Sequence, residues 1–554
     1  LSHNPLLLCK TVLPMFRLTI LIISFFLFCS NSIFAQPLQR PKLVVGIVVD
    51  QMRWDYLYRY YDRYSPDGFK RMLNQGFNCE NTFIPYTPTY TAAGHTAVYT
   101  GSVPAINGII GNSWYRRDLK RSWYCAEDTT VNTVGSNSTA GKMSPRNMWT
   151  TTITDELRLA TNFNSKTIGI ALKDRGAILP AGHSANAAYW FDNSSGGWIT
   201  STYYMNDLPA WVKKINDKKL PDQYLQQNWN TLYPINTYKQ STADDKSYES
   251  NLRGEDNTFP HLTASITKDK YETFRTTPYG NTYTFEMAKA AVDGEQLGQR
   301  GATDFLTVSF SSTDYVGHAF GPNSIEAEDV YLRLDKEMGA FFNFLDAKLG
   351  KGQYLVFLTA DHGAAHVPEF MKENRIPAGA FDDAEIRKWL NENAEKKFGV
   401  KNAIEQVMNY QLYLNYSALE ANKVEQDDFK KWAIKELRQH PAIMSAFDLH
   451  ELAETTLPNT IKERVNNGYN QKLSGDIQFV FMPQWFDGGY KGTTHGTWNP
   501  YDAHIPMLWF GWKVKPGKTN RETYMTDIAP TVAALLHIQM PNGTVGHVVE
   551  ELTK

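Results

Sequence analysis

Three aspartates in this sequence stand at or shortly after the end of a long apolar run. They are Asp50, Asp314 and Asp361, and the runs that precede them cover 43–49, 304–310 and 354–360. A carboxylate beside an apolar core is costly to bury unless a cation or hydrogen-bond donors face it. One such aspartate alone is commonly a helix N-cap. Three of them favour a site that binds a cation.

Histidines accompany these aspartates at short spacing. His318 lies four residues after Asp314, His362 follows Asp361 directly, and His495 lies in a glycine-rich loop. Carboxylate and neutral imidazole are suitable ligands for zinc. Together with the first aspartate they are more than one tetrahedral ion needs, and they suit two ions with open positions. The sequence therefore predicts a two-metal site.

A hydroxyl at the start of a short helix supplies a candidate nucleophile. Residues 88–101 indicate a loop that enters a helix and stops at Gly101, with Thr91 at the helix start. The free N–H groups and the dipole of a helix N-terminus favour an anion, either an alkoxide or a phosphoryl oxygen. Thr91 could also be only the N-cap, and the two interpretations are compatible, because a cap hydroxyl becomes a nucleophile once a metal or a base removes its proton. His95, four residues on, is expected to be structural or to support the site from outside.

The elements that must position these residues alternate along the chain. The three apolar runs and a fourth at 505–511 predict strands, while 325–349 and the stretch from Asp527 to residue 536 predict helices. This alternation predicts an α/β fold with a mainly parallel central sheet and helices on both faces. Sites in such sheets gather outside the carboxyl ends of the strands, which is where the three aspartates stand.

Two segments do not follow the alternation. Residues 192–280 are rich in Trp, Tyr, Asn, Asp and Lys, and residues 365–490 carry amphipathic, charge-rich stretches. We expect both to be inserted cap segments over the open edge of the sheet, without cores of their own. Residues 36–554 are accordingly predicted to form one domain.

The N-terminal region predicts export. Residues 15–35 combine an arginine near the start with a short apolar core, which is typical of a secretory signal. An uncleaved membrane anchor is the alternative, although the run is short for a membrane span. After signal removal we expect a periplasmic or secreted monomer without stable membrane contact. Whether Cys79 and Cys125 then form a disulfide is left open.

The overall charge excludes one class of partner. The 554 residues include 56 basic and 58 acidic side chains, which give a net charge of −2. Nothing in this balance indicates a surface for a polyanion, so no nucleic-acid partner is expected.

Taken in order, the motifs resemble the alkaline phosphatase superfamily. The matching elements are Asp50, 88–91, 107–112, Asp314 with His318, 361–363, His495 and 527–531. Within the superfamily, the sequence is most similar to the exported bacterial alkaline phosphatase that phosphate does not repress and that uses a threonine nucleophile. The resemblance implies an alkaline-phosphatase-like fold.

The resemblance also implies two Zn²⁺ ions and a ligand set for each. The first set would be Asp314, His318 and His495. The second would be Asp50, Asp361, His362 and Thr91. Metal coordination would lower the pKa of the Thr91 hydroxyl, which would attack phosphorus and form a covalent phosphothreonine. Asn112 would donate its side-chain amide to a non-bridging oxygen, helped by the backbone N–H after Thr91.

Lys173 and Arg175 bear on the class of substrate. They lie two residues apart after a predicted strand at 167–171 and could reach one ligand from the same face. The resemblance implies that they contact the extra phosphoryl oxygens and favour monoesters, because Arg can bind two oxygens and Lys adds a point charge. A solvated surface turn is the alternative interpretation of this Lys-Asp-Arg triplet.

The function implied is that of a zinc-dependent phosphomonoesterase acting on small phosphate esters. The nearest alternative is a nucleotide pyrophosphatase or phosphodiesterase with the same metals and Thr91, and a third is a non-catalytic metal- or phosphate-binding protein. Lys173 and Arg175 discriminate between the first two, because a diesterase needs room there for an apolar or nucleoside group.

Overall fold

The computed structural model describes residues 39–252 and 257–554. The predicted export signal at 15–35 lies outside the described residues. Residues 41–554 form one compact unit. None of the helices within the described residues has the length and apolar character needed to cross a bilayer.

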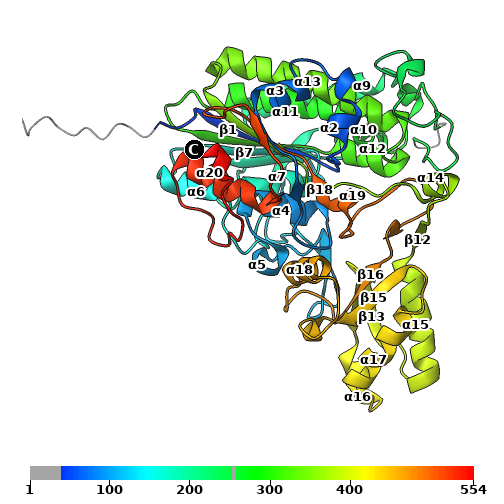
Figure 1. The fold of residues 1–554 in the computed structure, drawn as a ribbon. Coiled ribbons are helices and arrows are strands. Elements are labelled where there is room, and N and C mark those ends of the chain that lie inside the picture. The colour runs from blue at the N-terminus through cyan, green and yellow to red at the C-terminus, as the bar shows by residue number, and fades with distance from the viewer. Residues whose placement is uncertain (1–38, 253–256) are drawn as a thin grey trace, which may run out of the picture. The chain divides into compact units, whose positions relative to one another are not determined.

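A ten-stranded mixed sheet forms the centre of this unit (Figure 1). Its strands, in spatial order, are β20 (Gly517–Thr519), β2 (Phe77–Cys79), β19 (Met507–Gly511), β11 (Tyr354–Thr359), β1 (Leu43–Val49), β10 (Asp304–Phe310), β7 (Thr167–Ala171), β8 (Ala187–Phe191), β9 (Trp198–Ser201) and β6 (Thr133–Val134). The five consecutive strands β11, β1, β10, β7 and β8 are parallel to one another. The predicted parallel centre is therefore confirmed.

The fourth apolar run behaves differently from the expectation. It forms β19, which pairs antiparallel with β11 and with β2. An apolar run predicts a strand covered on both faces, but it carries no information about strand direction. On the other side of the parallel centre, β9 and β6 are also antiparallel. The sheet is mixed because the strand direction reverses on both sides of the parallel centre.

Helices cover both faces of the sheet, as predicted (Figure 1). On one face lie α3 (Phe69–Gln75), α11 (Tyr279–Gly294) and α13 (Ile325–Leu349), and on the other lie α4 (Thr91–Thr100), α6 (Ile153–Ala160), α7 (Asp174–Ala181) and α20 (Ile528–Leu536). The α13 helix has the bounds that its apolar spacing predicts. Its N-cap Ser324 accepts a hydrogen bond from the Ala327 N–H, which satisfies one free donor of the first turn.

The register of the central strands brings the three aspartates to one edge. Val49 of β1 pairs with Phe310 of β10, and Val48 pairs with Thr359 of β11. The residues that follow these strands therefore leave the sheet side by side. This edge is the carboxyl end of the parallel strands, where α/β sheets place their sites.

The two inserted segments differ from each other. The described part of 192–280 packs into the main core, to which it contributes Trp198 and Phe274 among others. The segment 365–490 instead forms a four-stranded sheet of β13 (Ile404–Met408), β14 (Gln411–Leu414), β16 (Ile477–Phe481) and β15 (Ile443–Asp448), drawn in yellow and orange in Figure 1.

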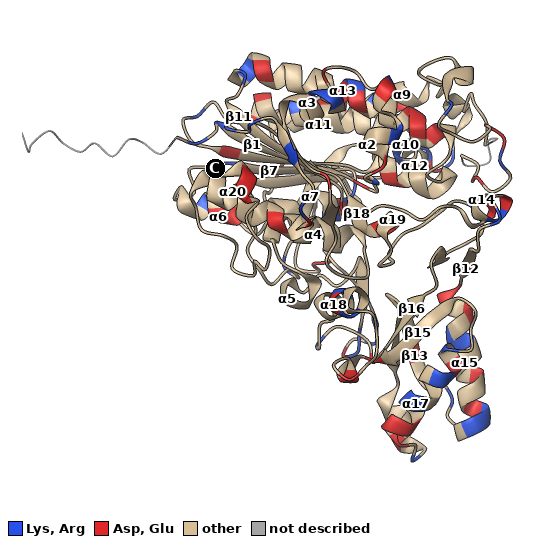
Figure 2. Ribbon diagram, in the orientation of Figure 1, with Lys and Arg blue, Asp and Glu red and all other residues tan. Residues whose placement is uncertain are grey.

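That four-stranded sheet packs on α15 (Asp383–Phe398) and α17 (Gln426–Leu437) around an apolar cluster of its own. The expectation that 365–490 lacks a core is thus wrong. Three or more strands with a helical cover are enough to bury a separate apolar face. Figure 2 shows basic and acidic residues together on α15 and α17, so the solvent face of this insertion is mixed in sign.

Cys79 and Cys125 are both free and buried. They belong to different apolar clusters, with Cys79 in the main core and Cys125 in the cluster beside α7. The disulfide left open by the sequence does not form.

Candidate metal centre and nucleophile

The candidate ligands converge beyond the carboxyl ends of β1, β10 and β11. Two groups have ligand atoms that all lie within 4.8 Å of one another. The first is Asp50, Asp361 and His362, and the second is Asp314, His362 and His495. His362 is common to both groups, so the two groups form one continuous centre.

His362 lies at the middle of this centre. Its Nε2 is 3.5 Å from Asp50 Oδ1 and 3.4 Å from Asp361 Oδ2. The Thr91 hydroxyl is 3.3 Å from the same nitrogen. The second predicted ligand set thus stands together in space, including the candidate nucleophile.

The other predicted ligand set gathers around Asp314. Asp314 Oδ1 is 3.1 Å from His318 Nε2 and 3.8 Å from His495 Nε2. His318 is the outermost ligand, with 35% of its side chain exposed, and it falls outside the two groups of mutually close atoms. The His495 ring instead stacks on His362, with ring centres 3.4 Å apart.

All three imidazoles present the same nitrogen to the centre. Nδ1 of His318, His362 and His495 lies 2.7–2.9 Å from the carbonyl oxygens of Thr493, Gly363 and Thr89 respectively. A carbonyl can only accept a hydrogen bond, so each Nδ1 carries the proton and donates it. A ring held this way has its Nε2 lone pair free for a metal when it is neutral, which is the arrangement that backbone carbonyls impose on ligand histidines.

The carboxylates show the strain of like charges held together. Burial raises the pKa of Asp50 well above its usual range, and the neighbouring Asp361 adds to the rise. Burial also acts on Asp361 and Asp314, but nearby imidazoles outweigh it and lower the pKa of both. Burial lowers the pKa of His495 well below its usual range, with help from His362. The histidine is therefore neutral, as a ligand must be.

Two orphaned oxygens test whether the centre suits a metal ion. Asp50 Oδ1 and Asp361 Oδ2 are buried and have no hydrogen-bond partner in the described structure. Both face His362 Nε2. Unpaired carboxylate oxygens beside a free imidazole lone pair form a donor set for a divalent cation. The residues present fit such an ion.

Lys173 lies closer to the ligands than expected. Its ammonium donates to Asp50 Oδ2 at 2.6 Å and to Asp314 Oδ2 at 2.5 Å, and so links the two groups. The attraction of these carboxylates outweighs burial and raises the pKa of Lys173. A buried ammonium between two buried carboxylates is well paired, which explains the position.

Arg175 has different hydrogen-bond partners from Lys173. Its Nη1 donates to the Tyr124 hydroxyl at 3.1 Å, and Tyr124 in turn donates to Asp174. Asp174 begins α7, so Lys173 is the N-cap of this helix and Arg175 lies in its first turn. Arg175 Nε is buried and lacks a hydrogen-bond partner within the described structure.

Thr91 is the first residue of α4, and Tyr90 is the N-cap. The hydroxyl of Thr91 points to His362 and does not cap the helix. The N–H of Ala92 donates to Asn112 Oδ1 at 2.9 Å. This N–H was expected to help bind a phosphoryl oxygen, and its hydrogen bond to Asn112 was not predicted. The bond fixes the Asn112 amide with its oxygen bound and its NH₂ available to donate.

Comparison with known proteins agrees with this geometry. The sequence profile of the family described as "Type I phosphodiesterase / nucleotide pyrophosphatase" matches residues 44–503. The chain belongs to this family. The family lies within the alkaline phosphatase superfamily, so the resemblance seen in the sequence is confirmed.

Relatives match this family member over nearly its full length. A protein of Myroides odoratus named "Calcium-transporting ATPase" is 55% identical over 523 residues, which are 93% of this chain and 95% of that protein. Alkaline phosphatase PhoV of Synechococcus elongatus is 53% identical over 524 residues, 94% of this chain and 95% of PhoV. The chain is an enzyme of the alkaline phosphatase type.

The crystal structure of wild-type alkaline phosphatase PafA, from Elizabethkingia meningoseptica, is similar throughout. The TM-score is 0.92 at 51% identity, covering 94% of this chain and all of that one. A PafA variant of known structure has a Thr, an Asn, a Lys and an Arg replaced together. The first two are spaced as Thr91 and Asn112 are here, and the last two as Lys173 and Arg175.

Two residues beside the candidate ligands were not among the predicted site residues. His95 was expected to be structural or to support the site from outside, and Gln51 was not predicted. His95 Nδ1 lies 3.2 Å from Asp361 Oδ2, and its Nε2 lies 2.7 Å from the Ser309 hydroxyl. Its position four residues after Thr91, on the same helix face, was a usable signal. Gln51 contacts two of the ligand carboxylates, and nothing in its spacing indicates this.

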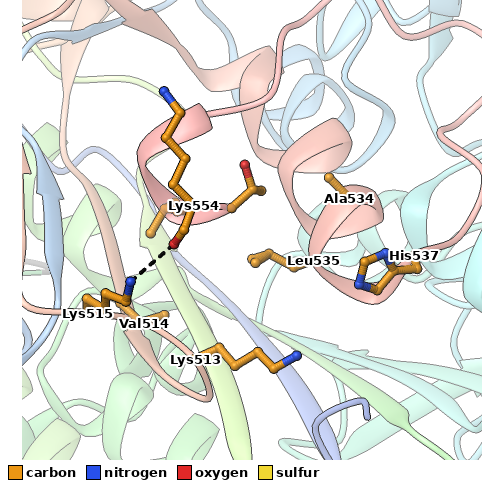
Figure 3. Close-up of a pocket in the computed structure, with 9 residues that line it drawn as sticks. Lys513, Val514, Lys515, Ala534, Leu535, His537 and Lys554 are labelled. Atoms are coloured by element: carbon orange, nitrogen blue, oxygen red, sulfur yellow. Dashed lines mark hydrogen bonds between the residues drawn. The ribbon is translucent and has the colours of Figure 1, made fainter. Parts of the chain in front are cut away.

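Some of the described cavities lie elsewhere on the enzyme. One of about 400 Å³ is lined by residues from the β19–β20 loop, α20 and the C-terminal segment (Figure 3). Lys515 Nζ donates to the Lys554 carbonyl oxygen at its rim. No candidate site residue lines this cavity, so it is separate from the metal centre.

Proposed function

We propose that this chain is a zinc-dependent phosphate monoesterase that works through a covalent phosphothreonine at Thr91. One observation carries the proposal. A threonine hydroxyl at the start of a buried helix stands 3.3 Å from a histidine that two Asp/His groups share. A hydroxyl in that position is the nucleophile that a two-metal centre can activate.

The proposed ligand sets are the ones that the resemblance implies. Asp314, His318 and His495 would hold one zinc, and Asp50, Asp361, His362 and Thr91 the other. Bound zinc supplies Lewis acidity, which lowers the pKa of a coordinated hydroxyl and neutralises charge at both ends of an in-line displacement. Hydrolysis of the phosphothreonine then releases phosphate and restores Thr91.

The remaining groups bind and orient the phosphoryl oxygens. The first turn of α4 directs a positive dipole end at the site, although the Ala92 N–H is already bound to Asn112. Asn112, oriented by the Ala92 N–H, donates its NH₂ to a non-bridging oxygen. Phosphoryl transfer depends mainly on position and charge, so these donors and the nearby cations Lys173 and Arg175 are sufficient side-chain chemistry.

Lys173 and Arg175 favour a monoesterase over the diesterase that the family description also allows. A monoester dianion carries one more negative charge than a diester. Lys173, which pairs with Asp50 and Asp314, and Arg175 two residues later supply positive charge that suits it. The name of the Myroides relative describes that protein, and nothing in the described site favours ion transport.

We also propose export, with residues 15–35 as the signal, and small phosphate esters as substrates. The deciding experiment compares kcat/KM for a matched aryl phosphate monoester and diester on zinc-loaded chain 36–554. We expect a strong monoester preference. A strong diester preference would assign the chain to the pyrophosphatase branch, and tight phosphate binding without turnover would indicate a binding protein.

Metal removal provides the second arm of this test. Chelation should abolish hydrolysis, and added zinc should restore it better than magnesium, because Asp and His donors suit zinc while magnesium prefers oxygen ligands and water. Restoration by magnesium alone would overturn the metal assignment. The number of ions is read independently from the zinc content per chain.

A further inference from the structure

Gln51 contacts ligands of both metal groups at once. Its backbone N–H donates to Asp361 Oδ1 at 3.2 Å, and its side-chain Nε2 donates to Asp314 Oδ1 at 2.7 Å. Gln51 directly follows Asp50 and is 3% exposed. Both donors belong to one residue, so Gln51 fixes the positions of the two carboxylates relative to each other.

We infer that Gln51 is a positioning residue that sets the separation of the two metal positions. The inference rests on the proposed function, because it assumes that Asp314 and Asp361 hold different zinc ions. Outer hydrogen bonds to ligand carboxylates fix which oxygen faces the metal. Gln51 makes one such bond on each side of the centre.

The hydrogen bonds leave one Asp361 oxygen without a partner, while both Asp314 oxygens accept hydrogen bonds. Asp361 Oδ1 accepts from the N–H groups of Gln51 and His362, so its other oxygen, which lacks a hydrogen-bond partner in the described structure, faces the centre. Asp314 Oδ1 accepts from the Gln51 amide, while Oδ2 accepts from Lys173. An amide can supply this bond where a carboxylate would repel.

The backbone conformation of Gln51 indicates that the surrounding structure fixes the position of this residue. Its φ is +64°, a left-handed conformation that non-glycine residues rarely adopt. Such strain persists only where the surroundings determine it, and it concentrates at functional sites. The chain also makes room for the amide, because a Cβ at Gly317 would overlap Gln51 Oε1. Glycine at 317 keeps α12 (Ser312–Phe320) close enough for the bond to Asp314.

Two substitutions separate the amide from the backbone. Gln51→Gly retains the N–H and suits the left-handed conformation, but removes the amide. Gln51→Glu retains the shape and places an acceptor against Asp314. Gly317→Ala should displace the amide without altering residue 51. Zinc affinity is measured by competition with a chelator, and zinc per chain by elemental analysis, with no substrate present.

We expect one zinc ion, the one held by Asp314, to bind about 10–100-fold more weakly in all three variants, which is the usual loss when an outer partner of a ligand is removed. The second ion should change less in Gln51→Gly, because the N–H to Asp361 remains. Thermal unfolding of the zinc-free Gln51→Gly chain is measured alongside, because the relieved backbone strain is opposed by the loss of the buried amide and of its bond to Asp314.

Wild-type zinc affinity in Gln51→Gly and Gln51→Glu would overturn the inference and leave the proposed function intact. A lower melting temperature of zinc-free Gln51→Gly with unchanged zinc affinity would also overturn it, because Gln51 would then be only structural. Absence of zinc binding by the wild-type chain would overturn the proposed function itself. The three outcomes are distinguishable without an activity assay.

Discussion

At the scale of single residues, both the backbone carbonyl and the hydroxyl of Thr91 have close partners. Its carbonyl oxygen lies 2.9 Å from His95 Nδ1, and its hydroxyl lies 3.3 Å from His362 Nε2. The side chain is 1% exposed. A hydroxyl that is buried and fixed in this way loses little further conformational freedom when it attacks phosphorus, which favours the reaction.

Thr91→Ala should abolish the covalent phosphoenzyme while zinc remains bound, because the other ligands of that ion stay in place. The phosphoenzyme is detected by trapping labelled substrate at low pH, and zinc by elemental analysis. Thr91→Ser retains the hydroxyl and is the matched control, for which we expect measurable turnover. Normal turnover by Thr91→Ala would remove Thr91 from its proposed role.

Arg175 is the cleaner test of substrate class, because Lys173 also pairs buried ligand carboxylates. Arg175→Ala should lower kcat/KM for a monoester about 10–100-fold, the usual worth of a charged hydrogen bond, and should affect a diester much less. Arg175→Lys retains the charge and should recover part of the loss. Equal losses for both substrates would show that Arg175 does not read the extra phosphoryl charge.

At the scale of elements, α4 carries the proposed nucleophile Thr91 and packs directly on the segment that carries Asp361. Gly94 makes this approach possible, because a Cβ there would overlap the carbonyl oxygen and the Cβ of Asp361. The distance between Thr91 and the metal ligands is therefore set by the absence of one side chain.

Gly94→Ala should move α4 away from Asp361 and lower kcat for monoesters by about 100-fold, since displacements of about 1 Å at such sites have effects of this size. Gly489→Ala is the control, because the nearest atom to its Cβ is 4.0 Å away. Steady-state kinetics with zinc at saturation gives the comparison. Unchanged kcat in Gly94→Ala would mean that α4 tolerates the shift.

The sequence allowed the main strands and helices to be predicted, because these depend on local pattern, whereas the two ligand sets came from the resemblance to the family. The strand at 167–171, the helix at 325–349 and the start of α4 at Thr91 all match the structure. Strand direction in β19 and the separate core of 365–490 depend on which apolar faces meet, and a single sequence does not contain this. Gln51 was missed because a left-handed backbone at a glutamine leaves no sequence signal.

At the scale of the whole molecule, some buried acids tie distant loops together. Asp502 Oδ2 accepts from the Thr497 N–H at 2.8 Å and from the Thr497 hydroxyl, while its carbonyl oxygen accepts from the Gly363 N–H. It therefore joins the His495 loop to the His362 loop. Burial raises the pKa of Asp502 to about 7.

The sign of the resulting pH dependence follows from proton uptake. Asp502 is ionised in the unfolded chain above about pH 4, but remains protonated in the folded chain up to about pH 7. Its contribution to the free energy of unfolding is fully present below pH 4 and is lost as the pH rises through 7. Asp55 behaves differently. Burial acts to raise the pKa of Asp55, but Arg53 and Arg59 outweigh burial and lower it. Asp55 is therefore ionised in both the folded and the unfolded chain above pH 5.

We therefore expect the melting temperature of wild type minus that of Asp502→Asn to fall between pH 5 and pH 8. The same difference for Asp55→Asn should stay constant over that range. Calorimetry at fixed saturating zinc gives both values. A constant difference for Asp502→Asn would show that this carboxyl titrates normally in the folded chain.

The state of the two described cysteines makes the enzyme convenient for site-directed labelling. Cys79 and Cys125 are buried, unpaired thiols, and burial raises the pKa of each to about 12, so neither offers a reactive thiolate at neutral pH. A chain that starts at residue 36 also lacks Cys9 and Cys29. One cysteine introduced at exposed Lys431 on α17 would then be the single site for a maleimide dye, and fluorescence from that dye would follow the insertion during turnover.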